Sequence, residues 1–194
     1  LLQAGAEVEV RDRVEGNTPL IQAAGARSLF AQEMVGRLLA AGADAKARAR
    51  DGFTALMAAA RAGNLRVVDQ RLVAGAEVNA RTEDGRTALL LAAEAGYARM
   101  VAALLERGAD PNLRAAGGRT PLGAAVLAKK PLCAALLLEA GAEVDAPDEA
   151  GYTPLMLAAR MGWEAMLLAL LEAGAEPNHR AASDGSTALH WAAN

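Results

Sequence analysis

Aromatic side chains are scarce in this chain. Two Phe, two Trp and two Tyr make up 3% of the 194 residues, although 53% of the residues are hydrophobic. A single packed core of this size usually holds several aromatic rings, because each ring buries a large apolar area. The composition therefore favours many thin layers of Leu, Ala, Val and Met over one deep core.

Cysteine and long apolar runs are equally sparse. The single cysteine, Cys133, cannot form an internal disulfide, and its apolar neighbours indicate a small buried hydrophobe. This usage favours a reducing compartment such as the cytoplasm. The richest apolar runs, at 131–138 and 166–171, fall short of the roughly 18 residues that a membrane helix needs. No signal peptide is recognisable, and we expect no membrane partner.

The chain lacks a basic excess and catalytic motifs. Its 20 basic and 23 acidic residues leave a net charge of -3, so nucleic acid is not an expected partner. The two histidines, His179 and His190, belong to no metal-binding or nucleophile motif, and Gly117-Gly118 lacks the rest of a phosphate loop. We expect no enzyme activity, no metal and no cofactor.

Two independent markers recur along the chain with one period. Gly-Ala pairs begin at positions 5, 42, 75, 108, 141 and 174, and Thr-(Pro/Ala)-Leu triplets begin at 18, 54, 87, 120, 153 and 187. Most of the steps are 33 residues long. Repetition at this scale predicts a solenoid or another repeat array.

Each repeat reads as a pair of short helices. The Thr of the triplet can cap a helix start, and Pro in the first helical turn loses no hydrogen bond. An Ala-rich first helix follows. In the repeat that begins near Thr87, residues 98–108 then place Val101, Leu104 and Leu105 at helical spacing, and Gly108 supplies a left-handed stop. One such pair cannot bury both of its apolar faces, so neighbouring pairs must stack.

The repeated motif resembles the signature of the ankyrin repeat family. The resemblance is carried by TPLIQAA, TALMAAA, TALLLAA, TPLGAAV, TPLMLAA and TALHWAA, which begin at the six triplet positions. It implies an all-α solenoid of stacked helix-turn-helix units, with loops projecting as fingers from one edge. It also implies a concave surface, formed by the fingers and the first helices, that binds proteins without catalysis.

The period divides a single domain, residues 1–194, into repeats. The expected partial repeats are 1–13 and 181–194, and the expected complete repeats are 14–48, 49–81, 82–114, 115–147 and 148–180. Neither end carries the polar outer face of a terminal repeat. Either further repeats or caps lie outside this sequence, or the helices at Leu1–Ala4 and Leu189–Ala193 pack against something else, including another copy of the chain.

Three departures from the family pattern predict local differences. The His of the family signature is retained only at His190, so apolar packing has to replace its hydrogen bonds and we expect looser fingers. Three extra residues in the first complete unit predict a longer loop between its helices, around 25–32. Lys129 replaces the turn glycine of the fourth unit, which predicts a costly backbone conformation there.

The residues just before each Thr form the predicted binding line. They are Asn17, Phe53, Arg86, Arg119, Tyr152 and Ser186. Neighbouring units stack at roughly 10 Å, the spacing of packed helices, so the middle four make a row of aromatic, Arg, Arg and aromatic. These residue types often dominate binding energy. The alternative is that both arginines are merely solvated and that the two rings fold back on their fingers.

Further contact residues are expected at the ends of the first helices. They are Arg61, Glu94, Leu127, Arg160 and Met161. Their mixed charges suit a protein segment with an apolar anchor and both charges. Tyr97 and Trp163 are expected to brace the turns between helices, and Trp191 to pack into the next layer.

The sequence thus predicts a non-catalytic protein-interaction module, a scaffold or adaptor, that binds a protein partner on its concave surface. Two alternatives stay open. The chain is a self-associating structural repeat segment, or it is the targeting region of a larger protein whose catalytic domain lies outside these residues.

Overall fold

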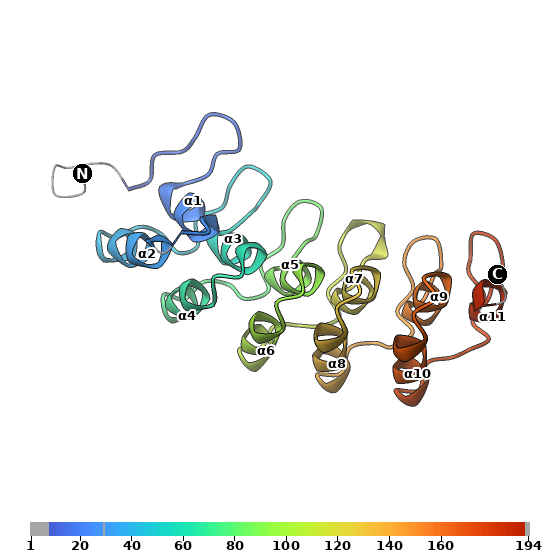
Figure 1. Ribbon diagram of the computed structural model, residues 1–194. Helices are drawn as coiled ribbons and strands as arrows, with labels where there is room; N and C mark the ends of the chain where they lie inside the picture. The colour runs from blue at the N-terminus through green and yellow to red at the C-terminus, as the bar shows by residue number, and fades with distance from the viewer. Residues whose placement is uncertain (1–7, 29, 193–194) are drawn as a thin grey trace.

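Eleven α-helices form a curved stack in the part of the chain that the computed structural model describes, residues 8–28 and 30–192, with the backbone alone for 71–73 (Figure 1). The first helices of the pairs form one row: α1 (Pro19–Gly25), α3 (Ala55–Ala62), α5 (Ala88–Ala95), α7 (Pro121–Leu127), α9 (Pro154–Arg160) and α11 (Ala188–Ala192). The second helices form the other row: α2 (Ala31–Ala40), α4 (Leu65–Val73), α6 (Ala98–Glu106), α8 (Pro131–Glu139) and α10 (Glu164–Glu172). The predicted all-α solenoid is confirmed.

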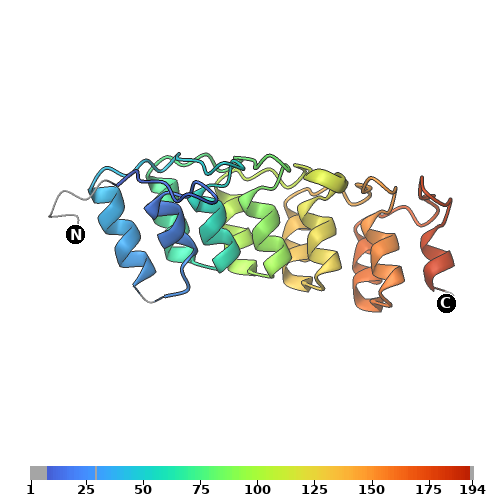
Figure 2. The ribbon, with the colours of Figure 1, turned by 90° about the horizontal axis from the view of Figure 1, so that it is seen from above.

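The connecting loops project from one edge of the stack as fingers (Figure 2). One finger contains the short 3-10 helix η2 (Ala116–Gly118), and another contains an isolated antiparallel bridge between Arg48 and Thr54. No helix in the described ranges is long and apolar enough to cross a membrane.

A threonine caps each first helix from α1 to α9. In α5, the side chain of Thr87 accepts a hydrogen bond from the backbone N–H of Leu90 at 3.2 Å, and Thr87 itself is 1% exposed. The same bond joins Thr54 to Met57 at 3.3 Å. A helix start leaves backbone donors without intrahelical partners, and in the buried row of first helices water cannot replace the hydroxyl.

Leucine and alanine build the core between neighbouring units. The leucine of each triplet is fully buried from the first complete unit to the fifth: Leu20, Leu56, Leu89, Leu122 and Leu155. The alanines that follow them are buried as well, and their small side chains let adjacent first helices approach closely. Cys133 lies in this core, as predicted, and burial raises the pKa of its thiol.

Backbone hydrogen bonds link each finger to the next one. The N–H of Arg50 donates to the carbonyl of Glu15 at 2.9 Å, and that of Glu83 donates to the carbonyl of Asp51 at 2.7 Å. Three equivalent bonds continue the series at Ala116, Glu149 and Ser183. The fingers are therefore tied together by their own backbone. The expectation that loss of the family histidine leaves them looser stays a prediction.

Asparagine side chains link the turns that follow the second helices of neighbouring units. Asn79 Nδ2 donates to the carbonyl of Gly108 at 3.0 Å, and its Oδ1 accepts from the N–H of Asp110 at 2.9 Å. Asn112 makes the same pair of bonds to Gly141 and Glu143, one unit later. These bonds satisfy backbone groups in the turns that follow the second helices, and they fix the spacing of adjacent units.

Two irregular turns lie where the sequence predicts them. In the first complete unit α1 ends at Gly25 and α2 begins at Ala31, whereas only Gly63 and Asn64 separate α3 from α4. Asn64 Nδ2 secures the start of the longer loop by donating to the carbonyl of Ala24, in the last turn of α1, and to that of Ala26. In the fourth unit, Lys129 has a φ of 54°, and no other non-glycine residue in the described ranges has a positive φ.

Only one of the two chain ends predicted to associate with another copy lies within the described residues. Leu1–Ala4 lie outside the described residues. At the other end, Leu189 is 76% exposed. Self-association through the ends stays a prediction.

We expect Thr87→Val to lower the free energy of unfolding by about 1–2 kcal/mol, because the N–H of Leu90 loses its acceptor without a large change in volume. Urea unfolding followed by circular dichroism measures the effect. The exposed Ser183→Ala is the matched control and is expected to stay within about 0.5 kcal/mol of the parent. An equally small effect of Thr87→Val would contradict the capping role.

We expect Lys129→Gly to raise the free energy of unfolding by about 1 kcal/mol, because glycine adopts a positive φ without steric cost. The same urea titration tests this. Gly96→Ala is the reciprocal variant and is expected to destabilise, since its φ is +85° and the new Cβ meets the Lys130 side chain. If Lys129→Gly destabilised the protein, the contact of Lys129 Nζ with the Met161 carbonyl, 3.5 Å away, would outweigh the strain.

Candidate functional site

Two aromatic–arginine stacks occupy equivalent positions in the second and fifth complete units. The guanidinium carbon of Arg61 lies 4.8 Å from the centre of the Phe53 ring, and that of Arg160 lies 5.3 Å from the centre of the Tyr152 ring. In both stacks the ring precedes the capping Thr, and the Arg lies seven residues after that Thr, near the end of α3 or α9. The predicted line and the predicted helix-end residues therefore meet at these two points.

The two central arginines of the line are held by carboxylates. Arg86 Nε lies 2.8 Å from Asp84 Oδ2 within one finger, and Arg119 Nη2 lies 2.8 Å from Glu94 Oε1 on the preceding unit. A hydrogen bond from the Thr82 hydroxyl, aided by the charge of Arg86, holds the pKa of Asp84 below its usual range. In contrast, neither Arg61 nor Arg160 has a salt bridge to any carboxylate in the described residues.

Tyr152 connects the fifth unit to the partial unit that follows it. Its hydroxyl donates to Asp184 Oδ2 at 2.9 Å, and its ring meets the Trp191 ring edge-on with centroids 6.2 Å apart. Trp191 Nε1 donates to the Ser186 hydroxyl at 3.1 Å. Trp191 therefore contacts the preceding unit, and its expected packing into a following layer stays a prediction.

Three other predicted residues have structural contacts. Met161 is the C-cap residue of α9 and is half-buried against the core. Tyr97 braces the turn at Gly63, where an added Cβ would lie only 2.8 Å from its ring, and its hydroxyl accepts from Arg27 at 3.3 Å. Trp163 is half-buried against the same core.

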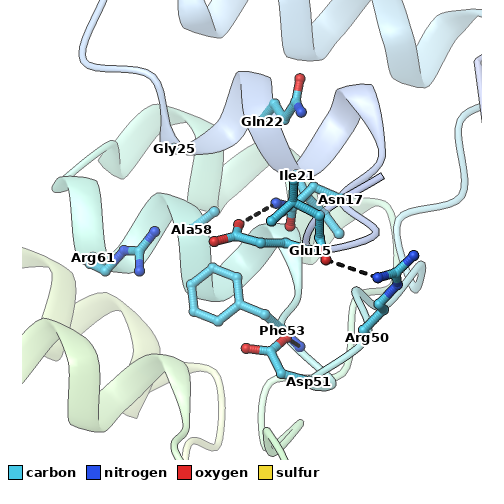
Figure 3. A pocket seen from close by; sticks show the side chains of 11 residues that line it. Glu15, Asn17, Ile21, Gln22, Gly25, Arg50, Asp51, Phe53, Ala58 and Arg61 are labelled. Carbon is cyan, nitrogen blue, oxygen red and sulfur yellow. Dashed lines mark hydrogen bonds between the residues drawn. The ribbon is translucent and has the colours of Figure 1, made fainter. Parts of the chain in front are cut away.

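A pocket of about 540 Å³ opens between the first two complete units (Figure 3). Its walls come from the fingers and from α1 and α3: Val14, Glu15, Asn17, Arg50, Asp51 and Phe53 from the former, and Ile21, Gln22, Gly25, Ala58 and Arg61 from the latter. The first aromatic–arginine stack thus forms part of a hollow rather than of a flat surface.

Gly25 opens this pocket by lacking a side chain. It lies seven residues after its capping Thr, at the position that Arg61, Glu94, Leu127 and Arg160 occupy in the later units. Its neighbour across the unit boundary, Ala58, is also small. Our sequence analysis missed the pocket, although the repeat register contained the signal: a glycine in the one unit where a long side chain is missing.

The pocket presents both charges around an aromatic ring. Glu15 Oε2 accepts from Asn17 Nδ2 at 2.6 Å, and Asp51 Oδ1 accepts from the backbone N–H of Phe53 at 2.9 Å. Figure 3 shows the Glu15 carboxylate and the Arg61 guanidinium both near the Phe53 ring. Arg50 points elsewhere and donates to the carbonyl of Val14 at 3.0 Å.

Asp12 shapes the finger that forms one wall of the pocket. Its carboxylate accepts hydrogen bonds from the backbone N–H groups of residues 14–17, at 2.8 to 3.1 Å, and from the side chain of Gln22. The bond from Glu15 has the largest effect, and together these bonds lower the pKa of Asp12 to about 2. The positions of Glu15 and Asn17 thus depend on an ionised carboxylate.

Within the described residues, no group of three or more His, Cys, Asp or Glu side chains could hold a metal ion. His190 lies at a first-helix start, where its Nδ1 is 2.9 Å from the Thr187 hydroxyl.

Comparison with known proteins agrees with the repeat pattern. A family model described as ankyrin repeats (3 copies) matches overlapping segments that together span the chain, at residues 1–81, 28–115, 63–148, 113–181 and 145–194. The search of curated proteins gives no match.

We expect the Asp12 carboxyl to titrate near pH 2 in the folded protein, against about 3.9 in an unfolded chain. Because the folded pKa is the lower one, the finger is stabilised above about pH 4 and loses that stability as the pH falls through 2. Carboxyl-detected NMR measures the midpoint. Asp12→Asn is expected to speed amide exchange at residues 14–17, and Asp44→Asn, in another turn, is the control. A midpoint near 4 would contradict this role.

Proposed function

We propose that this chain, which belongs to the ankyrin repeat family, binds a protein partner along its concave face. Ankyrin repeats are generally protein-interaction modules, and the family is typically non-catalytic. The observation that carries the proposal is the pair of aromatic–arginine stacks, Phe53 with Arg61 and Tyr152 with Arg160, placed three units apart on the same register.

Both stacks favour binding because they restrain exposed arginines before a partner arrives. A guanidinium that lies over a ring has fewer rotamers to lose, and its edge still offers several hydrogen-bond donors. Arg61 and Arg160 are exposed, and neither forms a salt bridge with a described residue. A carboxylate of the partner can therefore pair with either of them. Restrained aromatic and Arg side chains are the usual centres of binding energy.

The central ion pairs favour specificity rather than fold stability. The side chains of Arg86 and Asp84 are 43% and 48% exposed, and those of Arg119 and Glu94 are 35% and 41% exposed. Pairs this exposed contribute little to folding. They present alternating charges between the two stacks, and a partner with the complementary pattern gains orientation from them.

The pocket at Gly25 supports an anchor at one end of the face. A hollow with an apolar floor and charged walls accepts a single large side chain of a partner, and hot-spot residues commonly fill such pockets. The Phe53 ring belongs both to the pocket and to the first stack. We therefore expect this end of the face to contribute most to affinity.

Two variants test the assignment. Replacing Phe53, Arg86, Arg119 and Tyr152 together by Ala removes the line. Gly25→Arg fills the pocket with the side chain that its counterparts Arg61 and Arg160 carry. A Cβ at Gly25 lies 3.5 Å from that of Ala58, an ordinary contact, so the variant can fold. Pull-downs from a source lysate, read by quantitative mass spectrometry, compare both variants with the parent.

We expect the variant with four Ala substitutions to lose a protein that the parent captures. We expect Gly25→Arg to weaken the affinity for that protein by about tenfold or more, since filling one hot-spot pocket removes about 1.4 kcal/mol or more of binding energy. Arg66→Ala with Arg99→Ala, on exposed second-helix positions, is the control. If all variants captured the same proteins in the same amounts, the concave site would be wrong.

A further inference from the structure

The outer side of α8 and α10 exposes leucines that the solenoid does not need for its core. Leu132 is 71% exposed and Leu168 is 56% exposed. The inward residues of α8, which include Cys133, Ala134 and Leu137, are fully buried and account for its packing. Figure 1 shows α8 between α6 and α10 in the row of second helices, so the exposure of Leu132 does not arise at an end of the stack.

The repeat register shows that this apolar face is particular to two units. The positions equivalent to Leu132 are Arg66, Arg99 and Ala165, and those equivalent to Leu168 are Asp69, Ala102 and Ala135. The outer face of the second and third complete units is therefore charged or small. In the fourth and fifth units the outward positions Leu132, Ala135, Leu136, Ala165 and Leu168 are all apolar, and we name these five residues the α8/α10 outer face.

A different origin explains another large exposed apolar residue of a second helix, Met34, which is 53% exposed. Its counterparts in the later units are Val67, Met100, Cys133 and Met166, and all of them are buried. Met34 thus occupies a core position of the repeat. Leu132 does not, because Arg66 and Arg99 are exposed at the same register.

Unpaired carboxylates lie at three of the four ends of α8 and α10, while Lys129 and Lys130 precede the start of α8. Glu139, Glu164 and Glu172 lie at the ends of the two helices, all are exposed, and none forms a salt bridge with a described residue. The charge is also uneven along the chain: residues 131–180 hold eight acidic and two basic side chains, whereas 1–130 hold fourteen acidic and eighteen basic ones.

We propose that the α8/α10 outer face is a second docking surface, whose occupant is an amphipathic helix of a partner protein with an apolar stripe flanked by Lys and Arg. Exposed apolar patches rimmed by polar groups mark interaction sites. Two neighbouring helices present ridges into which a third helix packs, and basic flanks complement the carboxylate rim. The same rim repels a second copy of this face and an anionic lipid surface.

A binding assay with defined peptides tests this proposal. The probe is a fluorescent helical peptide of about 18 residues, five turns, with Leu and Ala on one face and Lys on its flanks; its partner probe has Glu in place of Lys. Leu132→Gln with Leu168→Gln removes the apolar face at exposed positions, so circular dichroism is expected to match the parent. Glu139→Gln with Glu164→Gln and Glu172→Gln removes the rim. Phe53→Ala with Tyr152→Ala is the control.

We expect the Lys peptide to bind the parent and the control alike, to bind the leucine variant about tenfold more weakly, and to lose affinity severalfold with the rim variant or with added salt. The Glu peptide is expected not to bind. Equal affinity of the leucine variant and the parent, or equal binding of both peptides, would overturn the proposal.

Two further outcomes would assign the face to another occupant and so also overturn the proposal. In the first, the parent sediments as a dimer and the leucine variant as a monomer. In the second, the parent binds phosphatidylserine vesicles and the leucine variant does not. The concave site uses none of these residues, so failure here and failure of the proposed function are distinguishable.

Discussion

The fold depends on one constraint: a single helix pair cannot bury its own apolar faces, so every unit is stable only against its neighbours. The buried leucines and alanines of adjacent first helices supply the apolar part of that contact. Hydrogen bonds from finger to finger and the links made by Asn79 and Asn112 supply the polar part. Together they hold the units at a fixed spacing. The position before the capping Thr is left to vary, although Tyr152 at that position also contacts the next unit.

This division allows each unit to present different chemistry at the same register. The position before the capping Thr carries a ring at Phe53 and Tyr152 and a cation at Arg86 and Arg119, while Leu20 and its counterparts hardly vary. Because the units are evenly spaced, the order of these side chains in the sequence is also their order along the concave face. The pocket at Gly25, in one unit, and the outer face of α8 and α10, in two units, are further places where the repeats differ from one another.

The repeat period predicted the helix pairs, the caps, the long first loop and the conformation of Lys129, because these depend on local backbone chemistry that the period repeats. The partners of Arg86 and Arg119 could not be predicted, since they depend on rotamers and on contacts between units. The contact of Trp191 with Tyr152 could not be predicted for the same reason. Gly25 was predictable from the register, but only by comparing one position across all of the units.

The central claim is that one partner spans both aromatic–arginine stacks. Photo-crosslinking tests it most directly: benzoylphenylalanine replaces Phe53 in one variant, Tyr152 in a second and the outer-face Arg99 in a control, and each is irradiated in a source lysate. Our account predicts that positions 53 and 152 crosslink to the same protein and that position 99 does not. Different proteins at 53 and 152, or a crosslink at position 99 alone, would contradict it.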